Sequence, residues 1–261
     1  IDALYYCASE DNVNEEIRLS KRYKFIKGNI DNEDLVNYIL NANNIDTVIN
    51  FAAQSHVCNS FSNPIQYTKD NVLGTHTLLD CCFKYNNETN NIKKFIHIST
   101  DEVYGESDLN EDKKMEQSVL CPTNPYAATK AGAELIVKSY YRSFNFPVII
   151  TRSNNIYGPN QYPEKVIPKF IQLLKENKKL TIHGNGDNLR SFLHSEDVSE
   201  AFYLILTKGV IGEIYNIGSD KEYKIIDVAK MLIKKIKNTE DYDTYLEYVE
   251  DRPFNDKRYY I

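Results

Sequence analysis

The sequence predicts an α/β protein with a Rossmann-like, doubly wound parallel sheet. Short β-branched apolar runs alternate with segments of helical periodicity through the first half of the chain. Strands that alternate with helices form parallel sheets covered by helices on both faces. An Asp-Glu pair directly follows one predicted strand, and a Tyr-x-x-x-Lys pattern begins the next predicted helix. Such sheets bind ligands at the carboxyl ends of their strands, so these residues are candidates for a functional site.

The elements follow one another in order through residues 1–154. β-Branched and apolar runs predict strands at residues 47–53, 94–100 and 148–151. Apolar residues at helical spacing predict helices at residues 67–84 and 126–144. Polar and charged stretches predict surface loops at residues 86–91 and 109–117.

The alternation loosens in residues 155–261. Helices are predicted there at residues 167–176, 196–207 and 226–236, between short strands and glycine turns. We therefore expect an N-terminal dinucleotide-binding domain at residues 1–154. A smaller C-terminal α/β substrate domain is expected at residues 155–261, with a chain that can cross back to the first domain.

The composition excludes several classes of partner. The formal charge of −6 argues against non-specific nucleic-acid binding, and no apolar run approaches membrane-spanning length. The five cysteines show no Cys-x-x-Cys spacing, and no signal peptide opens the chain. We expect a soluble protein in a reducing cytoplasm, with no metal site.

The polar residues after the strand at 94–100 suggest acid/base chemistry. Asp101 and Glu102 follow Thr100 at the carboxyl end of that strand, and Tyr126 and Lys130 share one face of the next helix. An adjacent ammonium favours the charged form of a phenol, so we expect Lys130 to lower the pKa of Tyr126. Two plainer interpretations remain, namely a solvated Asp-Glu turn and a chance Tyr-x-x-x-Lys on a solvated helix face.

Several ordered motifs together resemble one family. They are Phe-Ala-Ala-Gln-Ser-His at 51–56, Ser-Thr-Asp-Glu-Val-Tyr-Gly at 99–105, Asn-Pro-Tyr-Ala-Ala-Thr-Lys at 124–130, Tyr-Gly-Pro-Asn-Gln-Tyr-Pro-Glu-Lys-Val-Ile-Pro at 157–168 and Arg-Pro-Phe-Asn-Asp at 252–256. The chain resembles the nucleotide-sugar 4,6-dehydratases of the extended short-chain dehydrogenase superfamily through nearly its whole length. Arg-Pro-Phe-Asn-Asp resembles the dehydratase half of eukaryotic rhamnose synthases, which use UDP-glucose.

The resemblance implies a role for each catalytic candidate. Tyr126 would take the proton of the sugar 4-hydroxyl while C4 gives a hydride to NAD, with Thr100 and Lys130 orienting the reacting groups. Glu102 would then take the C5 proton, and Asp101 would protonate the departing 6-hydroxyl. This chemistry needs Asp101 protonated and Glu102 ionised, and two close carboxyls can have their pKa values pushed apart in that way.

The resemblance also implies binding residues. Asp2 would hold the adenosine ribose of NAD and repel the extra phosphate of NADP. The other implied cofactor residues are Asn29, Ile30, Phe51, Ala52, Ala53, Ser55, Tyr126 and Lys130. The implied substrate residues are Ser55, Thr100, Asn155, Lys165, Val166, Arg190, Asn216, Arg252 and Asn255. Among these, Arg190 and Arg252 are the candidates for binding the diphosphate, because guanidinium groups bind phosphate oxygens in a forked geometry.

The sequence departs from the family pattern at its start. The Gly-rich turn that holds the pyrophosphate normally precedes the acidic ribose-binding residue, yet Asp2 stands at the beginning, so the first strand and this turn are absent from the chain. We expect a fragment of a longer product, incomplete at both ends. A homodimer through the helix at 126–144 is expected by family analogy only.

We expect UDP-glucose to be the substrate, with dTDP-glucose as the alternative. Two other functions remain open, a nucleotide-sugar 4-epimerase and a catalytically silent NAD-sensing protein. The epimerase needs no carboxyl pair to expel water, whereas Asp101 and Glu102 are present here. A silent sensing protein would lack some of the catalytic residues, whereas all five candidates are present here.

Overall fold

The core of the molecule is a four-stranded sheet. The computed structural model describes residues 1–251 and 255–261. The strands are β1 (Thr47–Asn50), β2 (Lys94–Thr100), β3 (Val148–Ser153) and β7 (Ile214–Ile217), in the order β1-β2-β3-β7. Every neighbouring pair is parallel, so all four carboxyl ends lie along one edge.

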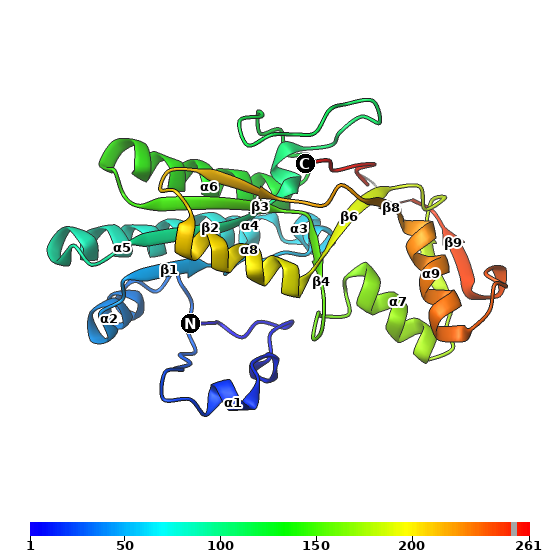
Figure 1. The fold of residues 1–261 in the computed structure, drawn as a ribbon, viewed down its shortest axis with the longest axis horizontal. Coiled ribbons are helices and arrows are strands. Elements are labelled where there is room, and N and C mark those ends of the chain that lie inside the picture. The colour runs from blue at the N-terminus through cyan, green and yellow to red at the C-terminus, as the bar shows by residue number, and fades with distance from the viewer. Residues whose placement is uncertain (252–254) are drawn as a thin grey trace.

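Helices cover both faces of this sheet (Figure 1). One face packs against α2 (Glu33–Asn43), α5 (Gly74–Thr89) and α6 (Pro125–Phe144), in a core that includes Phe95. The other face packs against α8 (Ser195–Lys208), in a core that includes Ile96. Successive side chains of a strand point to opposite faces, which is why the adjacent residues Phe95 and Ile96 of β2 belong to two different cores.

Short helices and turns occur along the first 104 residues. They are η1 (Glu10–Asn12), α1 (Glu15–Arg18), α3 (Val57–Ser62), α4 (Pro64–Tyr67), the π-helical turn η2 (Thr68–Leu73) and the 3₁₀ turn η3 (Asp101–Tyr104). Asp2 forms an isolated parallel bridge with Lys27, in which the Gly28 amide donates to the Asp2 carbonyl over 2.9 Å.

A second group of elements lies at one end of the molecule (Figure 1). It contains β5 (Leu180–His183), β9 (Leu246–Val249), α7 (Val166–Lys175), α9 (Ile225–Lys237) and η4 (Asp243–Tyr245). Its apolar core is separate from those of the main sheet and includes Phe170, Leu174 and Ile233. A small sheet of β4 (Asn155–Tyr157), β6 (Leu189–His194) and β8 (Glu222–Lys224) lies between this group and the main sheet (Figure 1).

The chain returns from this second group to the main sheet. After β6, α8 packs on the main sheet and β7 pairs with β3. The predicted α/β class with a parallel sheet is confirmed. The division into domains at residue 154 stays a prediction.

Three of the predicted elements differ from the structure. The strand predicted at 47–53 ends at Asn50. The helix predicted at 67–84 is interrupted by η2 before α5 begins at Gly74. The loop predicted at 86–91 is wrong, because α5 continues to Thr89 and ends on Asn90 in the left-handed conformation. Asn adopts this conformation at low cost, so a polar run can end a helix instead of forming a loop.

Candidate active site

The Asp-Glu pair lies on a 3₁₀ turn at the carboxyl end of β2. Thr100 ends the strand, and its hydroxyl accepts a hydrogen bond of 3.3 Å from the Glu102 amide. The same hydroxyl donates to Asp101 Oδ1 over 3.1 Å. Asp101 is 3% exposed, so the pair is not the solvated turn of the plainer interpretation.

Two asparagines that the sequence analysis did not select hold the carboxyl groups. Asn154 Nδ2 donates to Asp101 Oδ2 over 2.8 Å, and Asn124 Nδ2 donates to Glu102 Oε2 over 3.0 Å. Asn154 directly follows β3, and Asn124 caps the start of α6 by accepting from the Ala127 amide over 2.9 Å. A position at a strand end or a helix N-cap is the signal that could have identified them.

Burial changes the acidity of both carboxyl groups. It raises the pKa of Asp101, against hydrogen bonds from Asn154 and Thr100 that lower it. Burial, together with the nearby charge of Asp101, raises the pKa of Glu102 to about 7. Glu102 can therefore gain or lose a proton near neutral pH, beside an Asp101 carboxyl whose pKa is also raised.

Tyr126 and Lys130 lie on the first two turns of α6, beside this carboxyl pair. Both are buried, with 8% and 4% of their surface exposed, so the second plainer interpretation, a solvated helix face, is wrong. The Thr100 side chain is hydrogen-bonded to the Tyr126 phenol. Lys130 Nζ donates to the Ile98 carbonyl over 2.6 Å.

The acidity of the phenol differs from the expectation. Burial and the charge of Glu102 raise the pKa of Tyr126, whereas Lys130 was expected to lower it. Burial lowers the pKa of Lys130 to about 8, and Glu134 opposes this change. The ammonium is directed at a backbone carbonyl of β2, which accounts for its missing effect on the phenol in the protein alone.

The candidate cofactor residues at the start of the chain lie near one another. Asp2 is beside Lys27 through the parallel bridge, and its carboxylate accepts from the Leu4 amide over 2.7 Å. Asn29 is half-buried, and its side chain donates to the Tyr5 hydroxyl over 3.4 Å. Ile30 is 6% exposed and its side chain packs in the main core. Its contact with the cofactor stays a prediction.

The segment after β1 supplies the other cofactor candidates. Phe51, Ala52, Ala53 and Ser55 are all exposed. The Phe51 ring packs edge-on against Phe202 of α8, with 5.3 Å between the ring centroids. The strand prediction failed here because these apolar residues leave the sheet at its carboxyl edge.

Asn71 fixes the conformation of this segment, and the sequence analysis did not select it as a site residue. It is fully buried in η2. Its side chain accepts from the Gln54 amide over 2.7 Å and donates to the Gln54 carbonyl over 3.0 Å. It also donates to Thr129 Oγ1 of α6 over 2.9 Å. Asn71 therefore links the candidate cofactor segment to the helix that carries Tyr126 and Lys130.

Two of the predicted substrate residues with positive charge lie near the carboxyl pair. Lys165 precedes Val166, the first residue of α7, and its ammonium donates to the Ser55 carbonyl over 2.7 Å. Its charge and that of Arg190 lower the pKa of Glu102, against the raising effect of burial. The Arg190 guanidinium donates to the Asp256 carbonyl over 2.8 Å and lies 4.8 Å from the centroid of the Tyr259 ring.

The remaining substrate candidates differ in position. Asn155 is half-buried in β4. Asn216 is engaged elsewhere, because its side chain accepts from the Tyr104 hydroxyl over 2.8 Å and donates to the Lys114 carbonyl over 3.0 Å. Asn255 donates to Asp251 over 2.7 Å. Arg252 lies outside the described residues. Asn216 therefore already has protein partners for both ends of its side-chain amide, and its contact with substrate stays a prediction.

The described part of the chain contains neither a membrane-spanning helix nor a cluster of metal ligands. Across residues 1–251 and 255–261, no helix is long and apolar enough to cross a membrane. Within the same ranges, no group of His, Cys, Asp and Glu side chains could hold a metal ion.

A parallel α/β sheet with a buried Tyr-x-x-x-Lys pair at its carboxyl edge defines a site of the short-chain dehydrogenase type. The carboxyl pair beside the phenol adds the groups that an elimination needs. The chain belongs to the GDP-mannose 4,6 dehydratase family, whose sequence model matches residues 2–261.

Named relatives agree with this family. The chain is 52% identical over 264 residues to the trifunctional UDP-glucose 4,6-dehydratase/UDP-4-keto-6-deoxy-D-glucose 3,5-epimerase/UDP-4-keto-L-rhamnose-reductase RHM2 of Arabidopsis thaliana. That match covers 100% of this chain and 38% of the Arabidopsis protein. The dTDP-D-glucose 4,6-dehydratase of Homo sapiens is 48% identical over 263 residues, which cover 99% of this chain and 73% of the human protein.

A solved structure has the same fold. The dTDP-glucose 4,6-dehydratase DesIV from Streptomyces venezuelae, with NAD and TYD bound, is 35% identical and superposes with a TM-score of 0.92. The match covers 100% of this chain and 77% of DesIV.

Proposed function

We propose that this chain carries the catalytic site of an NAD-dependent UDP-glucose 4,6-dehydratase, which produces UDP-4-keto-6-deoxyglucose and water. The observation that carries the proposal is the carboxyl pair, Asp101 and Glu102, enclosed beside Tyr126 at the end of β2. Oxidation at C4 needs the phenol and the cofactor, whereas loss of water across C5 and C6 needs an acid and a base in addition.

The residues present fit NAD. Ala52 and Ala53 are exposed beyond β1, and small side chains there let a dinucleotide approach the edge of the sheet. Asp2 offers a carboxylate for the adenosine ribose, while Tyr126 and Lys130 offer polar groups for the nicotinamide ribose. When bound, NAD accepts a hydride from C4 and returns it to C6 at the end of the cycle. DesIV, which has this fold, binds NAD.

The protein residues move the protons of the reaction. Tyr126 takes the 4-hydroxyl proton during oxidation, and the Thr100 side chain orients the phenol. The resulting ketone acidifies the C5 hydrogen, which Glu102 removes as a proton. Asp101 protonates the 6-hydroxyl, so that water leaves and a C5–C6 double bond forms. Glu102 would then return its proton to C5 as C6 gains the hydride that the cofactor supplies.

The protonation states of the protein alone agree with only part of this assignment, because the negative charge of Asp101 raises the pKa of Glu102, so Asp101 is ionised where Glu102 titrates. The pKa of Glu102, raised to about 7, is suited to a base that works near neutral pH. Burial raises the pKa of Asp101 and thereby favours its acid form. Replacing both carboxyls in Asp101→Asn/Glu102→Gln should abolish the 4-keto-6-deoxy product. Continued formation of that product would contradict the proposal.

The choice of UDP-glucose rests on the greater likeness to the Arabidopsis protein than to the human dTDP-D-glucose 4,6-dehydratase. The motif Arg-Pro-Phe-Asn-Asp at 252–256 favours the same substrate. Uracil and thymine differ by one methyl group, and the ribose of UDP differs from the deoxyribose of dTDP by one hydroxyl. Each such difference changes the free energy of binding by about 1 to 3 kcal/mol. Mass spectrometry of products from the two nucleotides, supplied at equal concentration with NAD, tests the choice. A strong preference for dTDP-glucose would make dTDP-glucose the substrate.

The other two functions have less support. A 4-epimerase would leave Asp101 and Glu102 without a role, although both are enclosed at considerable cost in desolvation. A silent NAD-sensing protein would have no need of the intact set that also contains Thr100, Tyr126 and Lys130. Tight NAD binding with no turnover of any nucleotide sugar would favour the sensing protein.

We further propose a cytoplasmic homodimer with a dinucleotide-binding domain at residues 1–154 and a nucleotide-sugar domain at 155–261. The free thiols of all five cysteines are consistent with a reducing compartment. Exposed Leu135 and Phe144 on α6 supply apolar surface for a helical interface. A monomer by sedimentation at micromolar concentration would contradict the dimer.

A further inference from the structure

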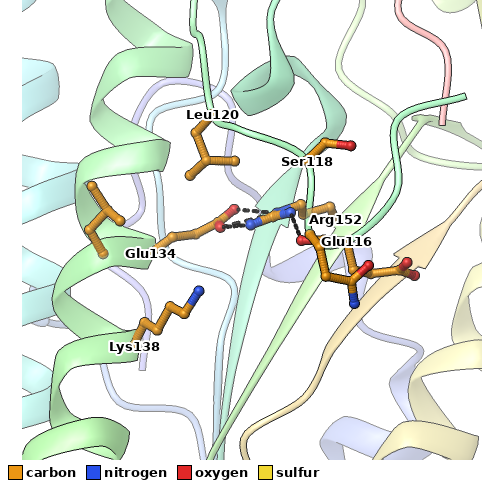
Figure 2. Close-up of a pocket in the computed structure, with 8 residues that line it drawn as sticks. Glu116, Ser118, Leu120, Glu134, Lys138 and Arg152 are labelled. Carbon is orange, nitrogen blue, oxygen red and sulfur yellow. Dashed lines mark hydrogen bonds and ion pairs between the residues drawn. The ribbon is translucent and has the colours of Figure 1, made fainter. Parts of the chain in front are cut away.

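A buried ion pair lies outside the carboxyl turn, between α6 and β3. Arg152 is 3% exposed and Glu134 is 2% exposed. Arg152 Nη2 lies 2.6 Å from Glu134 Oε2, and Nε lies 3.1 Å from each carboxylate oxygen. Figure 2 shows the two side chains meeting beside a pocket, with Lys138 one helical turn further along α6. The pocket has a volume of about 200 Å³.

Arg152 connects this pair to the carboxyl turn. Its Nη1 donates to the Tyr104 hydroxyl over 2.6 Å, and its guanidinium lies 4.6 Å from the centroid of the Tyr104 ring. Tyr104 is the last residue of η3, the turn that begins with Asp101 and Glu102. The Tyr104 hydroxyl in turn donates to Asn216 Oδ1 of β7 over 2.8 Å. The end of the turn is therefore tied to two strands of the main sheet.

Glu134 connects the pair to the lysine. It lies four residues after Lys130 on α6, so the two side chains share one face of the helix. Its negative charge raises the pKa of Lys130, which burial lowers to about 8. Arg152 in turn holds the Glu134 carboxylate in place, because its guanidinium lies at hydrogen-bond distance from both carboxylate oxygens.

An ion pair at this depth needs an explanation other than stability. Removing two charges from water costs free energy that their mutual attraction often fails to recover, so a pair of apolar residues could stabilise the fold as well. Buried ion pairs do fix the positions of their side chains, because a guanidinium and a carboxylate form their two hydrogen bonds in a planar, forked arrangement. The contacts of this pair lead to two parts of the proposed catalytic set.

We propose that Glu134 and Arg152 are positioning residues for the proposed dehydratase reaction. Glu134 holds Lys130 in its charged form, and Arg152 acts through Tyr104 to fix the turn that carries Asp101 and Glu102. The inference rests on the proposed function for its catalytic consequence. Its electrostatic part concerns the protein alone and can be measured without turnover.

The first experiment measures the pKa of Lys130 in the protein without cofactor, by competitive acylation at a series of pH values and mass spectrometry of the labelled peptide. Glu134→Gln should lower this pKa by about 1 unit, because it removes a neighbouring opposite charge. With NAD and nucleotide sugar present, the alkaline limit of sugar oxidation should move to lower pH by a similar amount. Glu134→Asp keeps the charge and should restore most of both values.

Lys138→Gln is the matched control, since it removes an exposed charge from the next turn of the same helix. It should leave the pKa of Lys130 unchanged. If Glu134→Gln does not fold, the double variant Glu134→Gln/Arg152→Met removes the pair without leaving an unpaired charge, and the same decrease is expected. An unchanged Lys130 pKa in whichever folded variant is measured would overturn the inference, as would an equal decrease in the control.

The second experiment tests the connection to the turn. Tyr104→Phe keeps the ring against Arg152 but removes the hydroxyl, so elimination should slow by about tenfold while oxidation at C4 changes little. Rapid-quench analysis of the C4-oxidised sugar and of the dehydrated product separates the two steps. Equal slowing of both steps, or of neither, would overturn this part. A wild-type protein that dehydrates no nucleotide sugar would instead refute the proposed function and leave the Lys130 measurement valid.

Discussion

Asn154 and Asp101 join two neighbouring strands at the catalytic edge. Asn154 follows β3, and its Nδ2 donates to Asp101 Oδ2 over 2.8 Å. Its Oδ1 accepts from the Ser219 amide over 3.0 Å, so the same side chain reaches the segment after β7. The proposed acid is thus held by a residue whose position depends on the order of the strands and not on nearby sequence.

Replacing Asn154 should disturb this acid. Asn154→Leu removes a hydrogen bond that lowers the pKa of Asp101, so that pKa should rise further and the alkaline limit of elimination should move to higher pH. Asn154 also stabilises the carboxylate that forms as Asp101 gives up its proton, so its loss should slow elimination by about 10- to 100-fold. The pH profile of the elimination step checks both effects. Ser219→Ala, which keeps the backbone amide, is the control, and identical profiles for wild type and Asn154→Leu would contradict the assignment.

Glu102 should make the folded protein less stable as the pH rises. Its pKa is about 7 in the folded state and 4.5 in the reference state, so between these values the folded chain holds a proton that the unfolded chain has lost. Stability then falls as pH rises through this range, and the loss is complete above the folded pKa. Glu102→Gln should therefore gain about 1 to 3 kcal/mol relative to wild type between about pH 4.5 and pH 8.

Urea unfolding of both proteins at these two pH values measures that difference. Glu88→Gln, an exposed carboxyl near the end of α5, is the control and should show no such pH dependence. A constant difference between Glu102→Gln and wild type at both pH values would show that burial does not raise this pKa.

Much of the fold follows from local sequence. The strand predicted at 94–100 coincides with β2, because Phe95, Ile96 and Ile98 supply apolar side chains to both faces of a buried strand. The helix predicted at 126–144 begins one residue earlier, at Pro125, where the fixed φ of proline suits the first helical position. The catalytic candidates could be predicted from the same two elements. Asp101 and Glu102 directly follow the strand, and Tyr126 and Lys130 lie in the helix.

The rest of the site depends on contacts across the fold. Asn71 could not be identified from local pattern, because its partners Gln54 and Thr129 lie 17 and 58 residues away in the sequence. The protein partners of Asn216 could not be predicted either, because a polar residue in a strand near the site gives no sign of which neighbour it contacts. Its actual partners, Tyr104 and Lys114, depend on how the 109–117 loop folds over the sheet.

Asn71 should be among the most important polar residues for stability. Asn71→Leu leaves the amide and carbonyl of Gln54 and the hydroxyl of Thr129 without their partner in a buried setting. The expected loss is about 2 to 4 kcal/mol, because each unsatisfied buried group costs free energy. Thermal unfolding measures this loss. Asn41→Leu, which removes an exposed side chain that bonds only within α2, should cost far less, and similar losses in both variants would contradict the prediction.

Lys130 should limit stability while it serves activity. Burial lowers its pKa to about 8 from 10.5, so the folded state is penalised at neutral pH, and this penalty disappears as pH rises from about 8 to above 10.5. Lys130→Met should therefore stabilise the fold at pH 7 by about 1 to 3 kcal/mol, less the hydrogen bond to Ile98, and its advantage should shrink at high pH. Oxidation of the nucleotide sugar should fall by about 100-fold or more in the same variant.

The comparison of these two effects is decisive for Lys130. Chemical unfolding near pH 7 and near pH 10 gives the stability difference, and the rate of C4 oxidation gives the activity. Lys69→Met, on η2 and exposed, is the control that should change neither by much. A Lys130→Met variant that is destabilised at neutral pH and retains oxidation would show that the ammonium is a structural cation. A stable but inactive variant would show that the fold accepts an unfavourable buried charge because the reaction requires it there.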